Sequence, residues 1–416
     1  MILTKAQHQI SGDDFFFLKQ MALKSQMVKS EAKTLPLIVW IILVSTCSAL
    51  IGGEGVLDFK MAGLAWFIPL LFSILLILRN PNQISFPFKL WIPWIILLMI
   101  YLITSEYQSL QRTIQLMCPI VIGIAVSTQN INVSQIKRFI VRCKHLSVAL
   151  ILIALWHTGT LLTGKIPLTT GLAPQSITAI LFCCLFAASY ASGNRKDLYW
   201  WGLMVGVPIF AVTRTAIAVA GLTLPLTFAP LKLKKRIVLV IVGLGVALAL
   251  FQTERIQKKM FYSGRGKLAD IQSKDFSDTG RKFMWDLMKK RIEQRPWFGH
   301  GTGSSELFLK SLLGNRTYPH NDWLLTLQDQ GILGTAVFAI SMLVAVFHAL
   351  RKAKTATFEA RLLFLAGASA FVSMALMMIT DNIMVYASYF GNLHFTILGL
   401  AYASEKNKKK AGEPLS

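Results

Sequence analysis

Charged residues are scarce in this sequence: they make up 15% of its 416 residues, while hydrophobic residues make up 54%. Soluble globular domains carry about 25% charged residues, so the composition excludes that class and indicates an integral membrane protein. Cysteine is scarce as well, and the five cysteines lie in or beside apolar runs without any C-x-x-C spacing. This pattern excludes a disulfide framework and a zinc site. The adjacent pair Cys183 and Cys184 is interpreted as small apolar lining.

Internal repeats are also lacking. The sequence shows no self-similarity at a fixed period and no pair of broken, inverted halves of the kind that secondary transporters have. This absence counts against a transporter.

Long apolar runs, in contrast, recur along the whole chain. A helix of about 20 apolar residues crosses a bilayer, and the runs predict an all-α polytopic membrane protein with about 12 transmembrane helices. The first run is too long, and lacks the small-residue cleavage site, for a removed signal peptide, so we expect it to remain as the first span. The expected spans are Leu35–Ile51, Met61–Leu78, Leu90–Ile103, Thr113–Ser127, Leu146–Leu162, Ser176–Ser192, Leu198–Thr213, Thr215–Ala229, Ile237–Phe251, Ile332–Leu350, Leu362–Thr380 and Ile383–Ala403.

Basic residues in the short loops predict the orientation, because cytoplasmic loops collect Lys and Arg. Every second loop is basic, whereas the alternate short loops hold only Lys60, Arg112, Lys165 and Arg214. Both termini are therefore expected in the cytoplasm. The expected domains are a basic segment at 1–34, transmembrane helices 1–9 at 35–251, a large outer loop at 252–331, transmembrane helices 10–12 at 332–403 and a basic tail at 404–416.

The large outer loop carries fourteen basic and seven acidic residues between Gln252 and Pro319. Loops longer than about 60 residues are not governed by the charge rule. A positive surface there suits an anionic lipid or a lipid-linked phosphate, although a plain solvated basic loop has the same composition.

One helix is expected inside this loop, in the stretch "SDTGRKFMWDLMKKRIEQRPWFGHGTGS". Asp278 or Thr279 can cap it, and Pro296 ends it. Arg281 lies in its first turn on the same face as three apolar side chains, where an arginine commonly extends to the membrane interface. The glycines of the following turn could let the backbone approach a bulky polar ligand.

The segment "YPHNDWLLTLQDQGILG" contains the pattern H-N-x9-G-x-x-G, formed by His320, Asn321, Gly331 and Gly334. We expect the glycines to permit close packing as the chain enters the membrane, which would fix the imidazole at the outer surface. A single histidine is more often structural than catalytic. Arg214 favours a functional interpretation, because it lies between two apolar spans with no acid within ten residues.

These features resemble the O-antigen ligase family, within the superfamily of O-antigen ligases, O-antigen polymerases and O-linked oligosaccharyltransferases of Gram-negative bacteria. The resemblance covers the topology of the whole chain, and in motifs it covers Arg214 and the range from Thr279 to Gly334. H-N-x9-G-x-x-G is its most specific element. "TGRKFMW" and "RPWFGHGTGS" are similar to superfamily segments that polymerases share.

The resemblance implies a GT-C-like glycosyltransferase of the bacterial inner membrane with a periplasmic active site. Such an enzyme transfers a preassembled O antigen from undecaprenyl diphosphate to a sugar hydroxyl of lipid A-core. It implies membrane lipids as partners, no nucleic acid and no cofactor. An O-antigen polymerase or a protein O-oligosaccharyltransferase would use the same donor, and a lipid-linked glycan transporter is a more distant alternative. The sugars and the oligomeric state stay open.

The resemblance also assigns roles. His320 would be the general base that activates the acceptor hydroxyl, and Arg214 and Arg281 would bind the diphosphate. A direct displacement would invert the anomeric centre, and no D-x-D sequence offers a metal site in the outer loops. The remaining candidates for substrate contacts are Asn321, Tyr318, Trp323 and Asp381.

Three of these candidates have simpler interpretations. Tyr318 and Trp323 could stack on sugar rings or be aromatic residues of the membrane interface. Asp381 could orient a base or an acceptor, or could cap a helix together with Asn382.

Overall fold

The computed structural model describes residues 34–51, 61–104, 109–162, 172–278, 280–314, 318–384 and 390–410. These residues form an all-helical bundle, and the one β-bridge among them pairs Phe261 with Phe276. The predicted all-α class is therefore confirmed. The expected basic leader at 1–34 lies, except for its last residue, outside the described residues.

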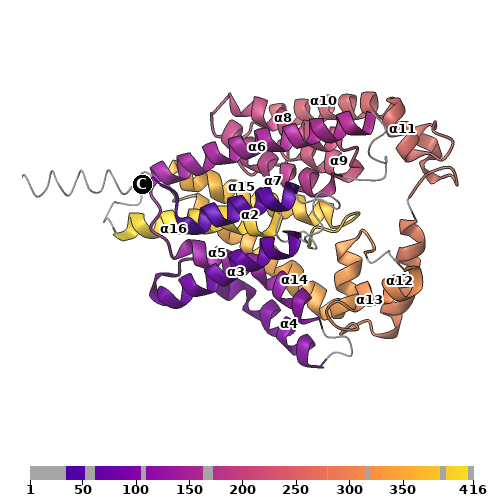
Figure 1. Cartoon of the computed structure of the whole chain (residues 1–416). Coiled ribbons are helices and arrows are strands. Elements are labelled where there is room, and N and C mark those ends of the chain that lie inside the picture. The colour runs from indigo at the N-terminus through magenta and orange to yellow at the C-terminus, as the bar shows by residue number, and fades with distance from the viewer. Residues whose placement is uncertain are drawn as a thin grey trace, which may run out of the picture.

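Fifteen helices and three 3-10 turns follow one another along the described chain (Figure 1). The helices are α2 (Leu37–Ile51), α3 (Met61–Arg79), α4 (Ile92–Thr104), α5 (Leu110–Ser127), α6 (Val133–Leu162), α7 (Ala173–Ala191), α8 (Asp197–Phe210), α9 (Arg214–Leu222), α10 (Leu233–Phe251), α11 (Glu254–Met260), α12 (Arg281–Gln294), α13 (Ser304–Leu313), α14 (Asp322–Ala353), α15 (Phe358–Met377) and α16 (Asn392–Lys410). The 3-10 turns are η1 (Pro81–Gln83), η2 (Phe88–Trp91) and η3 (Leu268–Gln272).

Five described helices are long and apolar enough to cross a membrane, namely α5, α6, α7, α14 and α15. The number rises to six if α10 and α11, which meet at 78°, are counted as one broken span. α2, α3 and α4 contain shorter apolar stretches. A multi-pass membrane protein is thus supported, whereas twelve complete spans are not.

The expected span Thr215–Ala229 departs furthest from the structure. α9 has nine residues, which at about 1.5 Å per residue gives about 13 Å, short of the about 30 Å of a hydrocarbon core. The chain beyond it is irregular as far as α10. There the Arg236 guanidinium donates to the carbonyl oxygens of Pro225, Thr227, Ala229 and Leu231. Arg236 thus satisfies backbone groups that a continuous helix would have paired.

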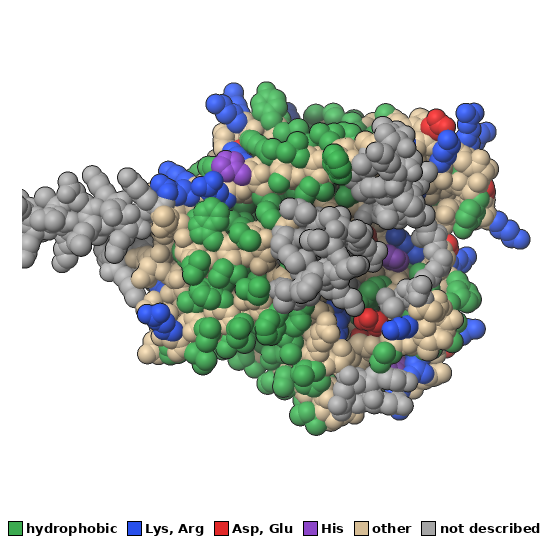
Figure 2. All heavy atoms as spheres, in the orientation of Figure 1, with side chains coloured by type: hydrophobic (Ala, Val, Ile, Leu, Met, Phe, Trp, Pro, Cys, Tyr) green, Lys and Arg blue, Asp and Glu red, His purple; other side chains and the backbone are tan. Residues whose placement is uncertain are grey.

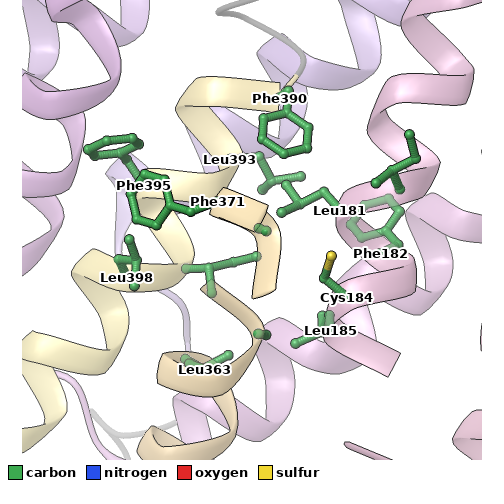
Figure 3. Close-up of a cluster of buried hydrophobic side chains, with 14 of the residues drawn as sticks. Leu181, Phe182, Cys184, Leu185, Leu363, Phe371, Phe390, Leu393, Phe395 and Leu398 are labelled. Carbon is green, nitrogen blue, oxygen red and sulfur yellow. The ribbon is translucent and has the colours of Figure 1, made fainter. Parts of the chain in front are cut away.

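The core of the bundle lies where α7, α15 and α16 meet (Figure 3). Leu181 and Cys184 of α7 point toward Phe371 of α15 and Leu393 of α16, and all four are buried. Cys183 is equally buried, which confirms the adjacent cysteines as apolar lining. This packed centre is a fixed frame for the segments at both ends of the helices.

One end of the bundle gathers the basic connections. The Lys406 ammonium donates to the carbonyl oxygens of Gln83, Ser127 and Thr128, and Lys137 pairs with Glu359 at 3.3 Å. The loops predicted to be cytoplasmic therefore lie together at this end, and α11, α12 and α13 lie at the opposite end (Figure 1). The side of the membrane that each end faces stays a prediction.

Candidate active site

Four segments bring the predicted catalytic residues together at the end of the bundle that carries α11 to α13. They are the start of α9, the connection before α12, the segment before α14 and the segment after α15. Figure 2 shows Lys, Arg and His side chains around a hollow on this part of the surface. His320 Nδ1 lies 3.4 Å from Asp381 Oδ1, and Arg281 Nη1 donates to the Thr380 carbonyl oxygen at 2.6 Å. Thr380 also shares a 2.5 Å hydrogen bond with the hydroxyl of Thr215, next to Arg214.

His320 has a constrained backbone. Its φ of 52° lies in the left-handed region, which residues other than glycine rarely adopt. Trp285 of α12 donates its indole N–H to the Pro319 carbonyl oxygen at 2.7 Å, and the Asn321 side chain caps α14 by accepting from the Leu324 N–H at 2.9 Å. Contacts on both sides therefore hold the strained residue in place. Its side chain remains 42% exposed.

Asp381 is the buried partner of this histidine, with 8% of its side chain exposed. Oδ1 also accepts the N–H of Asn382 at 2.9 Å, which fixes the carboxylate. A carboxylate at Nδ1 favours the tautomer that donates from Nδ1, and this leaves Nε2 as the atom that can accept a proton. The geometry suits the predicted orientation of a base.

Two buried charges that the sequence interpretation missed position the segment after α15. Asp322 Oδ2 accepts the Met384 N–H at 2.7 Å, and Arg112 Nη1 contacts the Met384 carbonyl oxygen at 3.4 Å. The Asp322 N–H itself donates to the Met378 carbonyl oxygen at 2.9 Å. Arg112 is expected from the sequence in a short loop, but it lies within the apolar sequence of α5. An arginine in such a sequence indicates a structural or functional role.

The two predicted diphosphate-binding arginines are half-buried and close enough to influence each other. Arg214 Nη1 donates to the Ser277 carbonyl oxygen at 3.1 Å. Burial lowers the pKa of Arg214, the positive charge of Arg281 lowers it further, and Asp278 opposes both effects. Burial likewise lowers the pKa of Arg281, against the carboxylates of Asp381 and Asp278.

Guanidinium groups stay protonated despite such shifts, so the site holds two cations that repel each other. Arg281 Nε is buried without a hydrogen-bond partner in the described part of the chain. An anion bound between the two guanidinium groups would relieve their repulsion.

The start of α12 explains the position of Arg281. The N-cap of α12 is Gly280, in the left-handed region, so the predicted cap at Asp278 is wrong by two residues. Asp278 still binds the start of the helix, because Oδ1 accepts the Gly280 N–H at 2.8 Å and Oδ2 accepts the Lys282 N–H at 3.3 Å. Thr279, the alternative cap, lies outside the described residues. The helix ends at Gln294, before Pro296, as predicted.

The comparison with protein families covers this region. Residues 201–339 match the family model described as O-antigen ligase. This part of the chain is similar to the O-antigen ligase family. Enzymes of this family are glycosyltransferase-like and process O antigens and related glycans. No curated protein matches the chain significantly.

The matched region, residues 201–339, includes Arg214, Arg281 and His320 and ends before Asp381. Asp381 follows α15 and His320 precedes α14, so the packing of these two helices brings Asp381 to the site. The roles of all four residues stay predictions.

The glycines of the H-N-x9-G-x-x-G pattern are packing positions, as predicted. Gly331 interrupts α14 with φ 67° and ψ −172°, a conformation essentially restricted to glycine. A Cβ atom there would lie 2.4 Å from the Trp297 carbonyl, and a Cβ atom on Gly299 would lie 2.5 Å from the Gly331 nitrogen. Gly334 is similarly crowded by Gln330.

The second half of the glycine turn in "RPWFGHGTGS" packs inside the protein, and the expected approach of the turn to a ligand stays a prediction. Buried Asp329 accepts the N–H groups of Gly303 at 2.7 Å and Ser305 at 2.8 Å. The N–H of Gly301 donates to the Asp329 carbonyl oxygen. The turn therefore fastens α13 to the break in α14.

The other predicted substrate contacts have structural partners. Tyr318 packs against a small apolar cluster formed by α12, α13 and α14. Trp323 donates its indole N–H to the Ala375 carbonyl oxygen at 3.0 Å and packs against the main core. The side-chain oxygen of Asn321 caps α14. Contacts of these three residues with sugars stay predictions.

Proposed function

We propose that this protein transfers a preassembled glycan from undecaprenyl diphosphate to a sugar hydroxyl of lipid A-core, as an O-antigen ligase of the bacterial inner membrane. The observation that supports it most directly is the pairing of His320 with buried Asp381 beside two half-buried arginines. One group can accept a proton there while the other two bind an anionic leaving group. This is the pair of tasks that glycosyl transfer from a lipid diphosphate requires.

In the proposed reaction, the acceptor hydroxyl oxygen attacks the anomeric carbon and His320 Nε2 takes the hydroxyl proton. Asp381 holds the imidazole at Nδ1 and stabilises the imidazolium that forms. The bond from the anomeric carbon to the phosphate oxygen breaks, and its electron pair leaves on the diphosphate. Attack opposite to the leaving group inverts the anomeric centre.

Arg214 and Arg281 bind the diphosphate in this scheme. Guanidinium groups form paired hydrogen bonds with phosphate oxygens and keep their charge. Thr380 connects them, since Arg281 donates to its carbonyl oxygen and Thr215, adjacent to Arg214, contacts its hydroxyl. This shared contact would keep the two guanidinium groups at a constant separation.

The test combines purified protein, undecaprenyl-diphosphate-linked glycan and rough lipopolysaccharide in detergent without ATP. A glycan ladder on the lipopolysaccharide, absent with His320→Ala, is the expected result. Extension of the donor glycan without use of lipopolysaccharide would assign a polymerase instead. Absence of any new covalent product with wild-type protein would contradict an enzymatic function.

A further inference from the structure

A short helix that the proposed mechanism does not use, α11, is fastened to the same backbone as Arg214. The Ser277 N–H donates to the Met260 carbonyl oxygen at 2.7 Å, while the Ser277 carbonyl oxygen accepts from Arg214 at 3.1 Å. Phe276 stacks edge-on with Phe261, and the Arg214 guanidinium lies 5.4 Å from the centre of the Phe276 ring. The end of α11 and Arg214 therefore form one local structure.

Lys259, the residue before Met260, brings a third cation to this structure. Partial burial lowers the pKa of its ammonium, the positive charges of Arg214, Arg255 and Arg281 lower it further, and the Asp381 carboxylate opposes them. Its side chain is exposed, and within the described residues no carboxylate forms an ion pair with it. Lys258 differs, because it pairs with Glu254 one helical turn away at 2.7 Å.

The preceding helix suggests the source of the anion. α10 runs directly into α11, and most of its apolar side chains are exposed on the surface of the bundle, including Val242 at 56%, Leu244 at 61% and Leu248 at 51%. A helix with such a surface lies against lipid in a membrane. Lys259 is therefore one short helix beyond a lipid-facing surface, where the headgroup of a membrane-bound donor would be found.

The charge of the donor changes during the reaction. A diphosphate esterified to both a lipid and a sugar carries two negative charges. When the bond to the sugar breaks, the departing oxygen gains a third. Two arginines match the charge of the intact donor, and a third cation is needed only as the leaving group separates. Interactions that strengthen in the transition state raise kcat.

We propose that Lys259 binds the departing diphosphate together with Arg214 and Arg281, and that it stabilises the negative charge that develops on the leaving oxygen. The inference rests on the proposed function. No proton transfer to Lys259 is required, because the ammonium acts by its charge and hydrogen bonds. It would therefore influence kcat and the binding of the lipid diphosphate product more than the binding of the intact donor.

The experiment compares Lys259→Gln, Lys259→Arg and the adjacent control Lys258→Gln in the full-length protein. The initial rate of transfer gives kcat and KM for the donor, and inhibition by undecaprenyl diphosphate gives the affinity for the product. We expect Lys259→Gln to lower kcat about 10- to 100-fold, the range of one hydrogen bond to a charged group. Product affinity should fall in parallel, with KM changed less than about threefold.

Lys259→Arg should keep most of the activity, because the charge remains, and this separates loss of charge from misfolding. Lys258→Gln should resemble the wild type, since its partner is Glu254. If the wild type transfers glycan and the substitutions at positions 258 and 259 have equally small effects, the proposed role of Lys259 is wrong and the proposed function stands. A wild-type protein that transfers no glycan in this assay would overturn the proposed function itself.

Discussion

Asp381→Asn isolates the effect of the carboxylate on the candidate base. Asparagine has nearly the same shape and keeps an oxygen that can accept from His320 Nδ1 and from the Asn382 N–H, so the local structure should survive. The negative charge is lost. The imidazolium that forms when His320 takes the acceptor proton then has no anion at Nδ1.

The expected loss follows from the 3.4 Å separation between His320 Nδ1 and Asp381 Oδ1. Two unit charges at that distance attract by about 1 kcal/mol in bulk water and by about 5 kcal/mol at an effective dielectric of about 20. The imidazole is 42% exposed, so solvent screening favours the lower half of this range. A loss of about 2 kcal/mol corresponds to a decrease in kcat of about 30-fold.

The same substitution removes a negative charge beside Arg281. Less negative charge then offsets the positive charges of Arg214 and Arg281, so the affinity for an anionic donor should not fall. KM for the donor should therefore stay constant or decrease. Steady-state kinetics of the glycan transfer assay separate the two effects. A decrease in kcat with an increase in KM would indicate damage to the donor site instead.

A double-mutant comparison tests whether Asp381 acts through His320. On a His320→Ala background, Asp381→Asn should have no further effect on the residual rate. The same 30-fold loss on both backgrounds would refute the proposed relation between the two residues.

Three other predictions concern the anion site, the metal and the break in α14. Arg214→Lys and Arg281→Lys should each lower the initial transfer rate by about 10-fold or more. The control Arg265→Lys, in the exposed loop, should change the rate less than twofold at matched expression. Equal mild losses at all three positions would mean that the loop contributes only diffuse surface charge. Transfer should persist in excess EDTA, and loss that magnesium or manganese restores would assign the diphosphate to a metal. Gly331→Ala should destabilise the protein by at least about 1–3 kcal/mol, seen as a lower unfolding temperature, while Gly243→Ala, with no atom within 4 Å of the added Cβ, should not.

Hydropathy predicted most helices but not the irregular chain between α9 and α10. The expected spans Ser176–Ser192 and Leu362–Thr380 correspond to α7 and α15 within a few residues. The expected span Thr215–Ala229 is as apolar as these, but hydropathy does not register whether the backbone can pair its own groups. Proline at 225 and the guanidinium of Arg236 together produce an irregular segment.

The site was only partly predictable for a related reason. Arg281 and His320 lie in recognisable local patterns, and Arg214 was conspicuous as a charge among apolar residues. Asp381 lies 61 residues beyond His320, and the hydrogen bonds that unite them run through the backbone at Met378 and Met384. Such contacts depend on how α14 and α15 pack, which no local pattern encodes. Lys259 was one of fourteen basic residues in its loop and had no distinguishing neighbour in sequence.

The spacing in H-N-x9-G-x-x-G follows from a closed set of contacts. Asn321 caps α14 and Gly331 breaks it, so the intervening residues form one helical segment of fixed length. The chain from Pro296 docks at the break, where the Ile332 N–H donates to its carbonyl oxygen at 2.8 Å. The helix that precedes Pro296 in the chain is α12, which packs against α14. Its Trp285 donates the indole N–H to the carbonyl oxygen of Pro319, the residue before His320. A change in the number of residues between Asn321 and Gly331 would therefore shift the His320 imidazole relative to the first turn of α12, which carries Arg281. The spacing therefore fixes the distance between the candidate base and the predicted anion site.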